Sequence, residues 1–365
     1  MPNTGFCWCS VFCFILFLGI LAYISIPYED LYRQMLNFYT FKSHSVTYAD
    51  VQLNGIIVYI YRLFINYNIP FDYIRLLQIP VSFALLYSIF KNKIENSIIE
   101  YSYKEINIRF LLLFLFFDLL YTIYGVRYGF ALSFYLYGMY LAIDQEKIKK
   151  AIVFFFLAIA FHQAFLFLGI LSLFFYKLKV STKMAIILGL FSIFVTNIGV
   201  GLLGKELLGA RYDWYFSGKG ANVSYSYMTM FGLLGFFLPK ICVIPYVHLV
   251  LKKQVKESKW YRISVVWLVI SLMFLSNAVL FYRTWWVFMA IGIYMLLDIE
   301  QFYIISYKCI RRLIISGILF CCFNSFAYHN MLAAIPFAEL SKPIPFILSH
   351  SYSKEDVVKY NILKH

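Results

Sequence analysis

Ten long apolar runs, separated by short polar segments, dominate this chain of 365 residues. The chain is 62% hydrophobic and 14% charged, whereas a soluble domain is about 45–50% apolar and about 25% charged. A helix needs about 20 apolar residues to cross a bilayer, so the sequence predicts an all-α, polytopic helical membrane protein of about 10 or 11 membrane segments. The runs lie at 6–27, 71–90, 107–125, 127–143, 151–176, 184–203, 227–251, 261–281, 284–299 and 313–329, with a weaker, more polar run at 51–67.

Membrane topology explains the net charge of +14, which in a soluble protein would suggest nucleic-acid binding. Cytoplasmic loops of membrane proteins collect Lys and Arg, so we expect no nucleic-acid partner. The segments assigned to the cytoplasm hold 18 Lys and Arg in 56 residues: 91–109, 144–150, 177–183, 252–262 and 301–312. The segments assigned to the outside hold 11 in 88 residues: 28–50, 124–127, 204–226, 282–283 and 330–365.

Two runs do not fit a simple crossing. Basic residues flank the run at 151–176 on both sides and should lie on one face of the membrane. We therefore predict two half-spans, 151–161 and 163–176, that form a hairpin turning at Phe161-His162-Gln163; the alternative is a single tilted helix of 26 residues. The run at 51–67 cannot cross once without inverting the loop that follows, so it is predicted to be re-entrant or interfacial.

The chain is predicted to form a single integral membrane domain over residues 1–365, with a large outer loop at 204–226 and an outer C-terminal tail at 330–365. Its seven cysteines lie mostly in apolar runs, with no CxxC pair and no histidine spacing typical of zinc. We therefore expect neither disulfides nor a metal site, and no cofactor.

Five ionisable residues fall on the outer side of this topology: Asp30, Arg127, His162, Arg211 and Arg283. A charged group within or at the edge of a membrane costs about 2.5–3.5 kcal/mol on insertion scales, so each one suggests a function. The guanidinium groups of Arg127 and Arg283 match phosphate oxygens, although either could instead anchor a helix end at the lipid headgroups. His162 could contact a diphosphate or transfer a proton, or be an ordinary buried side chain.

The outer loop and the first outer segment supply the remaining candidates. Tyr212, Trp214 and Tyr215 could stack on sugar rings beside Arg211, or simply anchor the loop at the interface. Asp30 could act as a general base towards a sugar hydroxyl, or cap a helix. The sequence has no D-x-D pair, Walker A loop or HExxH motif. An activated, lipid-borne substrate would then supply the energy, with arginines stabilising a diphosphate leaving group.

The stretch Arg127-Tyr128-Gly129-Phe130-Ala131-Leu132, followed by a basic loop and Ala158-Ile159-Ala160-Phe161-His162-Gln163-Ala164, resembles the EpsG-like and Wzy-type family of polysaccharide repeat-unit polymerases. This resemblance implies an inner-membrane glycosyltransferase, active at the periplasmic face in O-antigen or capsule synthesis. Its substrate would be an oligosaccharide on undecaprenyl diphosphate. Arg127, Arg283 and Arg211 would hold the diphosphate, with His162 and Asp30 in catalytic roles. A chain-length regulator is left open as a further partner.

Three other kinds of membrane protein are alternatives. An acyltransferase that modifies sugars would be expected to have a histidine near an early helix, but the early histidine of this chain, His44, lies in a loop. An O-antigen ligase would also use arginines to stabilise a diphosphate leaving group, but it would be expected to have a larger outer loop than the 23 residues of 204–226. A flippase or other transporter would be expected to have charges along a path open to both faces and a repeat relating its two halves, and the sequence shows neither. A polymerase is therefore the preferred hypothesis.

Overall fold

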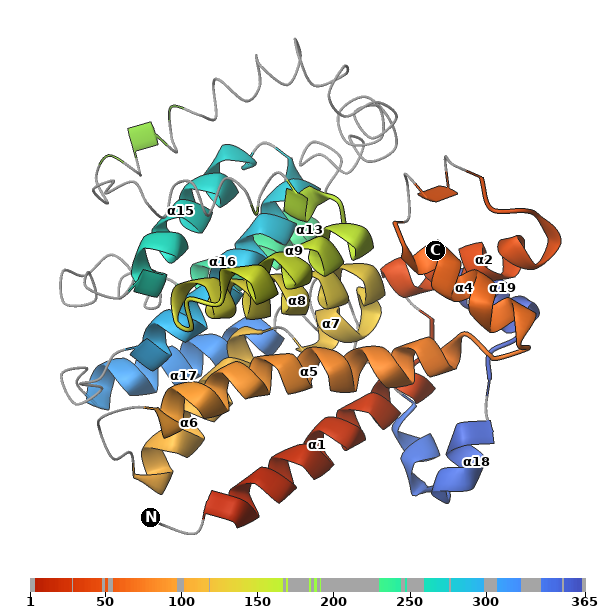
Figure 1. Cartoon of the computed structure of the whole chain (residues 1–365), viewed down its shortest axis with the longest axis horizontal. Coiled ribbons are helices and arrows are strands. Elements are labelled where there is room, and N and C mark those ends of the chain that lie inside the picture. Colours follow the sequence, from red (N-terminus) through yellow and green to blue (C-terminus); the bar gives the residue numbers. More distant parts are fainter. Residues whose placement is uncertain are drawn as a thin grey trace. The chain divides into compact units, whose positions relative to one another are not determined.

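The computed structural model of the chain is helical in every ordered element that it describes, so the predicted all-α class is confirmed for these residues (Figure 1). The described residues are 4–27, 29–47, 50–51, 55–96, 102–117, 119–166, 230–243, 259–275, 277–298, 307–322, 336–349 and 351–362, with isolated positions at 169, 184, 187, 188, 191 and 247.

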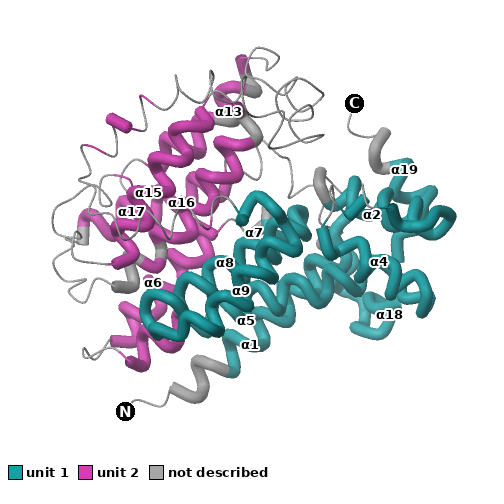
Figure 2. Tube along the Cα trace, turned by 45° about the horizontal axis from the view of Figure 1, so that its top comes forward, with its two compact units in different colours: residues 1–89, 119–167, 330–365 teal, residues 90–118, 168–329 magenta. Residues whose placement is uncertain are grey.

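The chain divides into two compact units, which we describe separately (Figure 2). Unit 1 comprises residues 1–89, 119–167 and 330–365, and unit 2 comprises residues 90–118 and 168–329. The single domain expected from the sequence stays a prediction.

Long helices form the body of unit 1, and they approach closely where small side chains meet. A Cβ atom on Gly19 would lie 2.9 Å from Cγ of Pro80, so the helices Thr4–Ile24 and Asp72–Glu95 cross at a glycine. Farther along, the hydroxyl of Ser133 donates to the hydroxyl of Ser82 at 3.2 Å. The long helices are α1 (Thr4–Ile24), α5 (Asp72–Glu95, of which residues up to 89 belong to the unit), α8 (Val126–Ile143) and α9 (Ile148–Phe161).

Helices α8 and α9 form an antiparallel hairpin through residues 144–147. Aromatic rings fill their contact, including Phe134 against Phe161 with centroids 5.7 Å apart and Tyr137 against Phe154 at 4.7 Å. The two ends of the hairpin differ in the residues that they carry. The turn end carries Lys147, Lys149 and Lys150, whereas the other end holds the first residues of α8 and the last residues of α9.

Short helices gather beside the ends of the long ones in unit 1 (Figure 1). Helix α2 contacts α4, α7, α8 and α19. At about 1.5 Å per residue, the 10 residues of α4 span about 15 Å and cannot cross a bilayer. This length fits the re-entrant or interfacial segment predicted at 51–67. The short helices are α2 (Glu29–Ser43), α4 (Ile57–Asn66), α7 (Leu119–Tyr124), η8 (Phe337–Ser341), α18 (Ile344–Ser349) and α19 (Lys354–Ile362).

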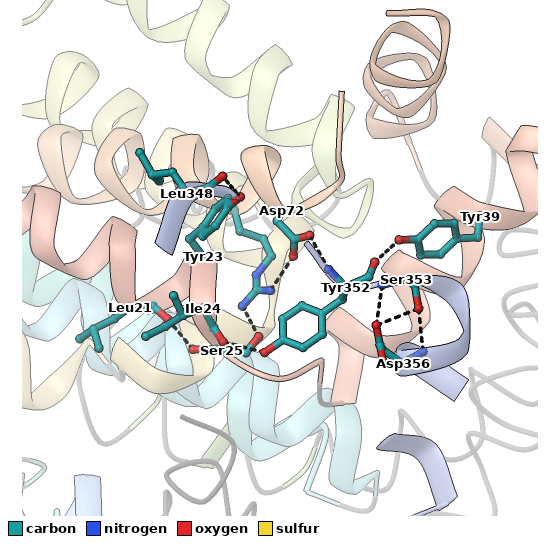
Figure 3. A network of polar contacts seen from close by, with 11 residues as sticks. Leu21, Tyr23, Ile24, Ser25, Tyr39, Asp72, Leu348, Tyr352, Ser353 and Asp356 are labelled. Carbon is teal, nitrogen blue, oxygen red and sulfur yellow. Dashed lines mark hydrogen bonds and ion pairs between the residues drawn. The ribbon is translucent and has the colours of Figure 1, made fainter. Parts of the chain in front are cut away.

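A buried ion pair joins the C-terminal segment to the body of unit 1 (Figure 3). Nη1 of Arg75 lies 3.1 Å from Oδ1 of Asp72, and the two side chains are 0% and 2% exposed. Nη2 of Arg75 donates to the carbonyl of Ser25 at 2.7 Å, at the end of α1. The backbone N–H of Tyr352 donates to Oδ2 of Asp72 at 3.2 Å, and its hydroxyl donates to the carbonyl of Ile24 at 2.8 Å. The predicted outer tail is thus an ordered part of the unit where the structure describes it.

The hydroxyl of Tyr39 adds a link between α2 and this network, because it donates to the carbonyl of Tyr352. Burial, and then the carboxylates of Asp72 and Asp356, raise the pKa of the Tyr39 hydroxyl to about 12. The hydroxyl therefore remains protonated, and remains a donor, at any physiological pH.

Unit 2 is a helical assembly in which α6 contacts α16 and α17, and α15 packs along α16 (Figure 2). Helix α6 ends at Phe116, and the carbonyl of Phe117 accepts a hydrogen bond from Nε1 of the buried Trp286 at 2.8 Å. The apolar run at 107–125 was expected to be one membrane segment, but the chain forms α6 and the separate short helix α7. The described helices of unit 2 are α6 (Tyr103–Phe116), α13 (Met230–Ile241), α15 (Lys259–Met273), α16 (Ala278–Asp298) and α17 (Tyr307–Cys322).

Among the described helices, α5 is the one long and apolar enough to cross a membrane by length and composition. Two shorter apolar helices, Cys9–Ile24 and Ile57–Asn66, fall below that length. The number of membrane segments stays a prediction.

Candidate functional site

Arg127 is the second residue of α8, and a buried amide holds its side chain. The orientation of the Gln34 amide that satisfies its neighbours has its oxygen accepting from Nη2 and Nε of Arg127 at 3.0 and 2.9 Å. The Gln34 nitrogen then donates to the hydroxyl of Tyr61 at 2.6 Å. Gln34 and Tyr61 are 1% and 0% exposed, whereas Arg127 is half-buried. We call these three residues the Arg127 triad.

Aromatic packing fixes the far end of the triad. The ring of Tyr61 lies 5.9 Å from that of Phe38 and 5.5 Å from that of Phe71, each in an inclined arrangement. Inclined aromatic pairs are favourable and restrict the rotation of both rings. The short helices α2 and α4 therefore place the Gln34 amide at the start of α8.

His162 follows the last residue of α9, where the backbone turns to an extended conformation with φ −150° and ψ 102°. The predicted break at Phe161-His162-Gln163 is therefore present, while most of the second half-span at 163–176 lies outside the described residues. The His162 ring is 9% exposed and packs edge-on against Tyr128 at 5.2 Å. Because Tyr128 adjoins Arg127 in α8, the histidine and the arginine lie at the same end of the hairpin.

Gly55 lets the chain before α4 pass directly over the end of α9. The backbone N–H of Ile56 donates to the carbonyl of Ala160 at 2.7 Å. Gly55 has a φ of +75°, which favours glycine, and a Cβ atom there would overlap the same carbonyl oxygen. Gly55 and Ile56 therefore lie against the backbone of Ala160 and Phe161, the two residues before His162.

Replacing Gly55 by alanine should destabilise the protein by about 2 kcal/mol or more, because the new side chain meets a strained φ and a backbone oxygen together. Thermal unfolding of the purified protein measures the loss. Ile56→Ala is the matched control, since the Ile56 side chain is 41% exposed. Equal melting temperatures for Gly55→Ala and the wild type would contradict the packing.

Two sources of positive charge meet at the N-terminus of α8. The 18-residue helix directs the positive end of its dipole towards this site, which adds to the charge of the Arg127 guanidinium. The lysines Lys147, Lys149 and Lys150 lie at the opposite end of the hairpin. An anion is therefore favoured here by a fixed guanidinium and by a helix terminus.

Asp30 and Asp50 lie on the segments around α2. Asp30 is the second residue of α2, four positions before Gln34, and its role as a base stays a prediction. Oδ2 of Asp50 accepts hydrogen bonds from Oγ1 and N of Thr47 at 2.6 and 2.8 Å, which lower the pKa of its carboxyl. The N–H of Asp50 in turn donates to Oγ1 of Thr47 at 3.3 Å, and this reciprocal pairing is that of a capping box.

Arg283 lies in unit 2, and the structure corrects its predicted position. It was expected in a loop at 282–283, but α15 ends at Met273 and α16 already begins at Ala278, so Arg283 is inside α16. Oδ1 of Asn277 accepts from the N–H of Leu280 at 3.0 Å and so caps the new helix.

A second cation accompanies Arg283. Nζ of the buried Lys240 lies 4.8 Å from the ring centroid of Tyr282, the residue before Arg283. Lys240 could have been singled out from the sequence, because it lies within an apolar run, next to Pro239 in α13. The other predicted residues, Arg211, Tyr212, Trp214 and Tyr215, lie outside the described residues.

Sequence reasoning missed Gln34 and Tyr61. In α2 the buried side chains that the structure describes are Leu31, Gln34, Met35, Phe38 and Phe41, so one amide interrupts the apolar face of an amphipathic helix. A polar residue on an apolar face is a usable signal, because a buried amide needs hydrogen-bond partners. Its partner in another helix was not visible in the pattern.

Comparison with known proteins agrees with the motif around Arg127 and His162. No curated protein and no solved structure matches the chain. A model of the EpsG family matches residues 5–342, which is nearly the whole chain and includes all of the candidate residues discussed above. The chain therefore belongs to the EpsG family, a family of polymerase-type membrane proteins of polysaccharide biosynthesis.

Proposed function

We propose that the protein is a polysaccharide repeat-unit polymerase of the cytoplasmic membrane. It transfers a growing glycan from undecaprenyl diphosphate to a new lipid-linked repeat at the periplasmic face, in O-antigen or capsule synthesis. Family membership supports both the reaction class and a lipid-linked oligosaccharide substrate. In this proposal the long apolar helices cross the membrane about 10 or 11 times.

The reaction forms one glycosidic bond and breaks another. A hydroxyl of the non-reducing-end sugar of the new repeat attacks the anomeric carbon of the growing chain. The bond from that carbon to the diphosphate oxygen breaks, and undecaprenyl diphosphate leaves with the electron pair. The hydroxyl proton passes to a base, for which His162 and Asp30 are the candidates.

The observation that carries the proposal is the placement of Arg127. A guanidinium held by Gln34, at the positive end of α8, is suited to the charge that develops on a departing diphosphate. In this way the site works without a metal ion. Arg283 and Arg211 would complete the diphosphate contacts, and Tyr212, Trp214 and Tyr215 would contact sugars.

The separation of Arg127 and His162 from the lysines of the α8–α9 turn supports a site on the periplasmic face. Cytoplasmic ends of membrane helices collect lysine, and Lys147, Lys149 and Lys150 lie at the other end of this hairpin. Labelling of single cysteines introduced at each end, with a reagent that does not cross the membrane, tests this orientation.

The surface polysaccharide of a deletion strain tests the reaction class. Loss of a polymerase should leave material that carries a single repeat, because transfer of the first unit does not need chain growth. Complete loss of repeats would point instead to a ligase or a flippase. Electrophoresis of extracted polysaccharide distinguishes the two patterns, and the wild-type gene on a plasmid should restore the full ladder.

A further inference from the structure

The Arg127 triad uses one side of the guanidinium fork. A guanidinium has five N–H donors in a planar fork. The Gln34 oxygen accepts from Nε and Nη2, at 2.9 and 3.0 Å, so this pairing lies along the edge that these two nitrogens share. Nη1 points away from that edge and takes no part in the pairing. The plane and the direction of the fork are therefore set by an amide on a different helix.

The amide itself is held in place. Its nitrogen donates to the Tyr61 hydroxyl at 2.6 Å, and both side chains are buried. The Tyr61 ring is fixed between Phe38 and Phe71. Gln34 lies between Leu31 and Met35 on the packed face of α2, so its side chain has little freedom to move. A rotamer-rich arginine held in this way loses less entropy when it binds an anion.

A carboxylate in place of the Gln34 amide could also accept from Nε and Nη2 of Arg127, so the choice of an amide at this position matters. A carboxylate would neutralise the guanidinium and compete with an anionic ligand, whereas a neutral amide orients the guanidinium and leaves its charge intact. The neighbours of the amide in the triad are a tyrosine hydroxyl and Arg127 itself.

We infer that Gln34, fixed by Tyr61, is the positioning residue that orients the guanidinium of Arg127 for the substrate diphosphate. This inference rests on the proposed function, in which Arg127 binds the diphosphate of the lipid carrier. It assigns a task to the two short helices α2 and α4: they carry the amide and the phenol that orient a guanidinium on α8.

Binding of farnesyl diphosphate to the purified full-length protein in detergent tests the inference, because this probe supplies an isoprenoid diphosphate without sugar. Gln34→Ala should weaken binding by about ten- to a hundredfold, since the guanidinium is present but no longer oriented. Gln34→Glu should weaken it at least as much, although Glu still contacts Arg127. Tyr61→Phe should have a smaller effect, of about threefold, because the amide remains.

Gln145 and Tyr140 provide matched controls at the opposite end of α8. Nε2 of Gln145 donates to the hydroxyl of Tyr140 at 2.9 Å, so this pair has the same chemistry without an arginine. Gln145→Ala and Tyr140→Phe should bind farnesyl diphosphate as the wild type does. Thermal unfolding of each variant separates loss of binding from loss of fold.

The variant Gln34→Glu separates positioning from a merely structural role. If Gln34 served only to hold Arg127 in the fold, Glu would serve as well, and wild-type affinity in Gln34→Glu would overturn the inference. If Arg127→Ala abolishes binding while the Gln34 variants bind normally, the inference fails and the proposed diphosphate site stands. If Arg127→Ala binds as tightly as the wild type, or the wild type does not bind, both fail.

Discussion

Cells in which Arg127 is replaced by alanine should make surface polysaccharide with a single repeat and no longer chains. In the proposed reaction the guanidinium stabilises the negative charge of the departing diphosphate. Removal of one such preorganised donor from an enzyme costs about a hundred- to a thousandfold in rate. A polymerase slowed by this factor should leave the single-repeat band dominant over the longer chains. Electrophoresis of extracted polysaccharide measures the result, with protein level checked by immunoblot of the membranes.

Two further variants show whether charge alone is enough. Arg127→Lys keeps the positive charge but presents a point charge in place of a planar fork, and it cannot make the contacts of Nε and Nη2 with Gln34. It should restore less than about a tenth of the chain growth. Lys150→Ala removes an exposed cation from the opposite end of the hairpin and should leave the ladder unchanged. Long chains from Arg127→Ala, at normal protein level, would remove Arg127 from the reaction.

Local signals predicted the parts of the fold that depend on neighbouring residues. The end of α9 at Phe161 was anticipated because lysines flank both sides of the run at 151–176, and this pattern is written in consecutive residues. The short 51–67 segment was distinguished in the same way, by its polarity and by the charges that follow it. The length of α4 agrees with that prediction.

The sequence placed Arg283 wrongly because hydropathy alone set the helix boundary. The predicted loop at 282–283 separated two apolar runs, but Arg283 did not end a helix. Asn277 is the actual boundary, since its side chain caps the N–H of Leu280. An asparagine just before an apolar run is a known helix start, so the sequence carried this signal too.

Pairings between distant residues could not be predicted from the sequence. Gln34 and Arg127 meet across α2 and α8, and Asp72 accepts from the backbone of Tyr352, 280 residues away. Each partner has an ordinary local explanation, a polar residue in an amphipathic helix or an acid in the first turn of a helix. Only the packing of the helices shows which partners meet, and the candidate site depends on such a pairing.

The largest effect on stability is expected from Arg75→Met. Asp72 and Arg75 are both buried, and removal of one partner from a buried ion pair costs about 3–5 kcal/mol because the other charge stays in the interior. Arg75 also holds the carbonyl of Ser25 at the end of α1, so that contact is lost as well. Titration of the purified protein in mixed micelles with sodium dodecyl sulfate unfolds it and measures the loss in free energy of unfolding.

The exposed pair Glu339–Lys342 is the matched control, because it has the same spacing of three residues and an N–O distance of 2.7 Å. Lys342→Met should cost less than about 1 kcal/mol, since solvent screens an exposed pair. The double variant Asp72→Leu/Arg75→Met should recover most of the stability lost in Arg75→Met, because no charge is then buried without its partner. Trypsin should also cleave after Lys354 faster in Arg75→Met, because Asp72 anchors the backbone of Tyr352. Equal losses from Arg75→Met and Lys342→Met would show that this ion pair does not hold the C-terminal segment in place.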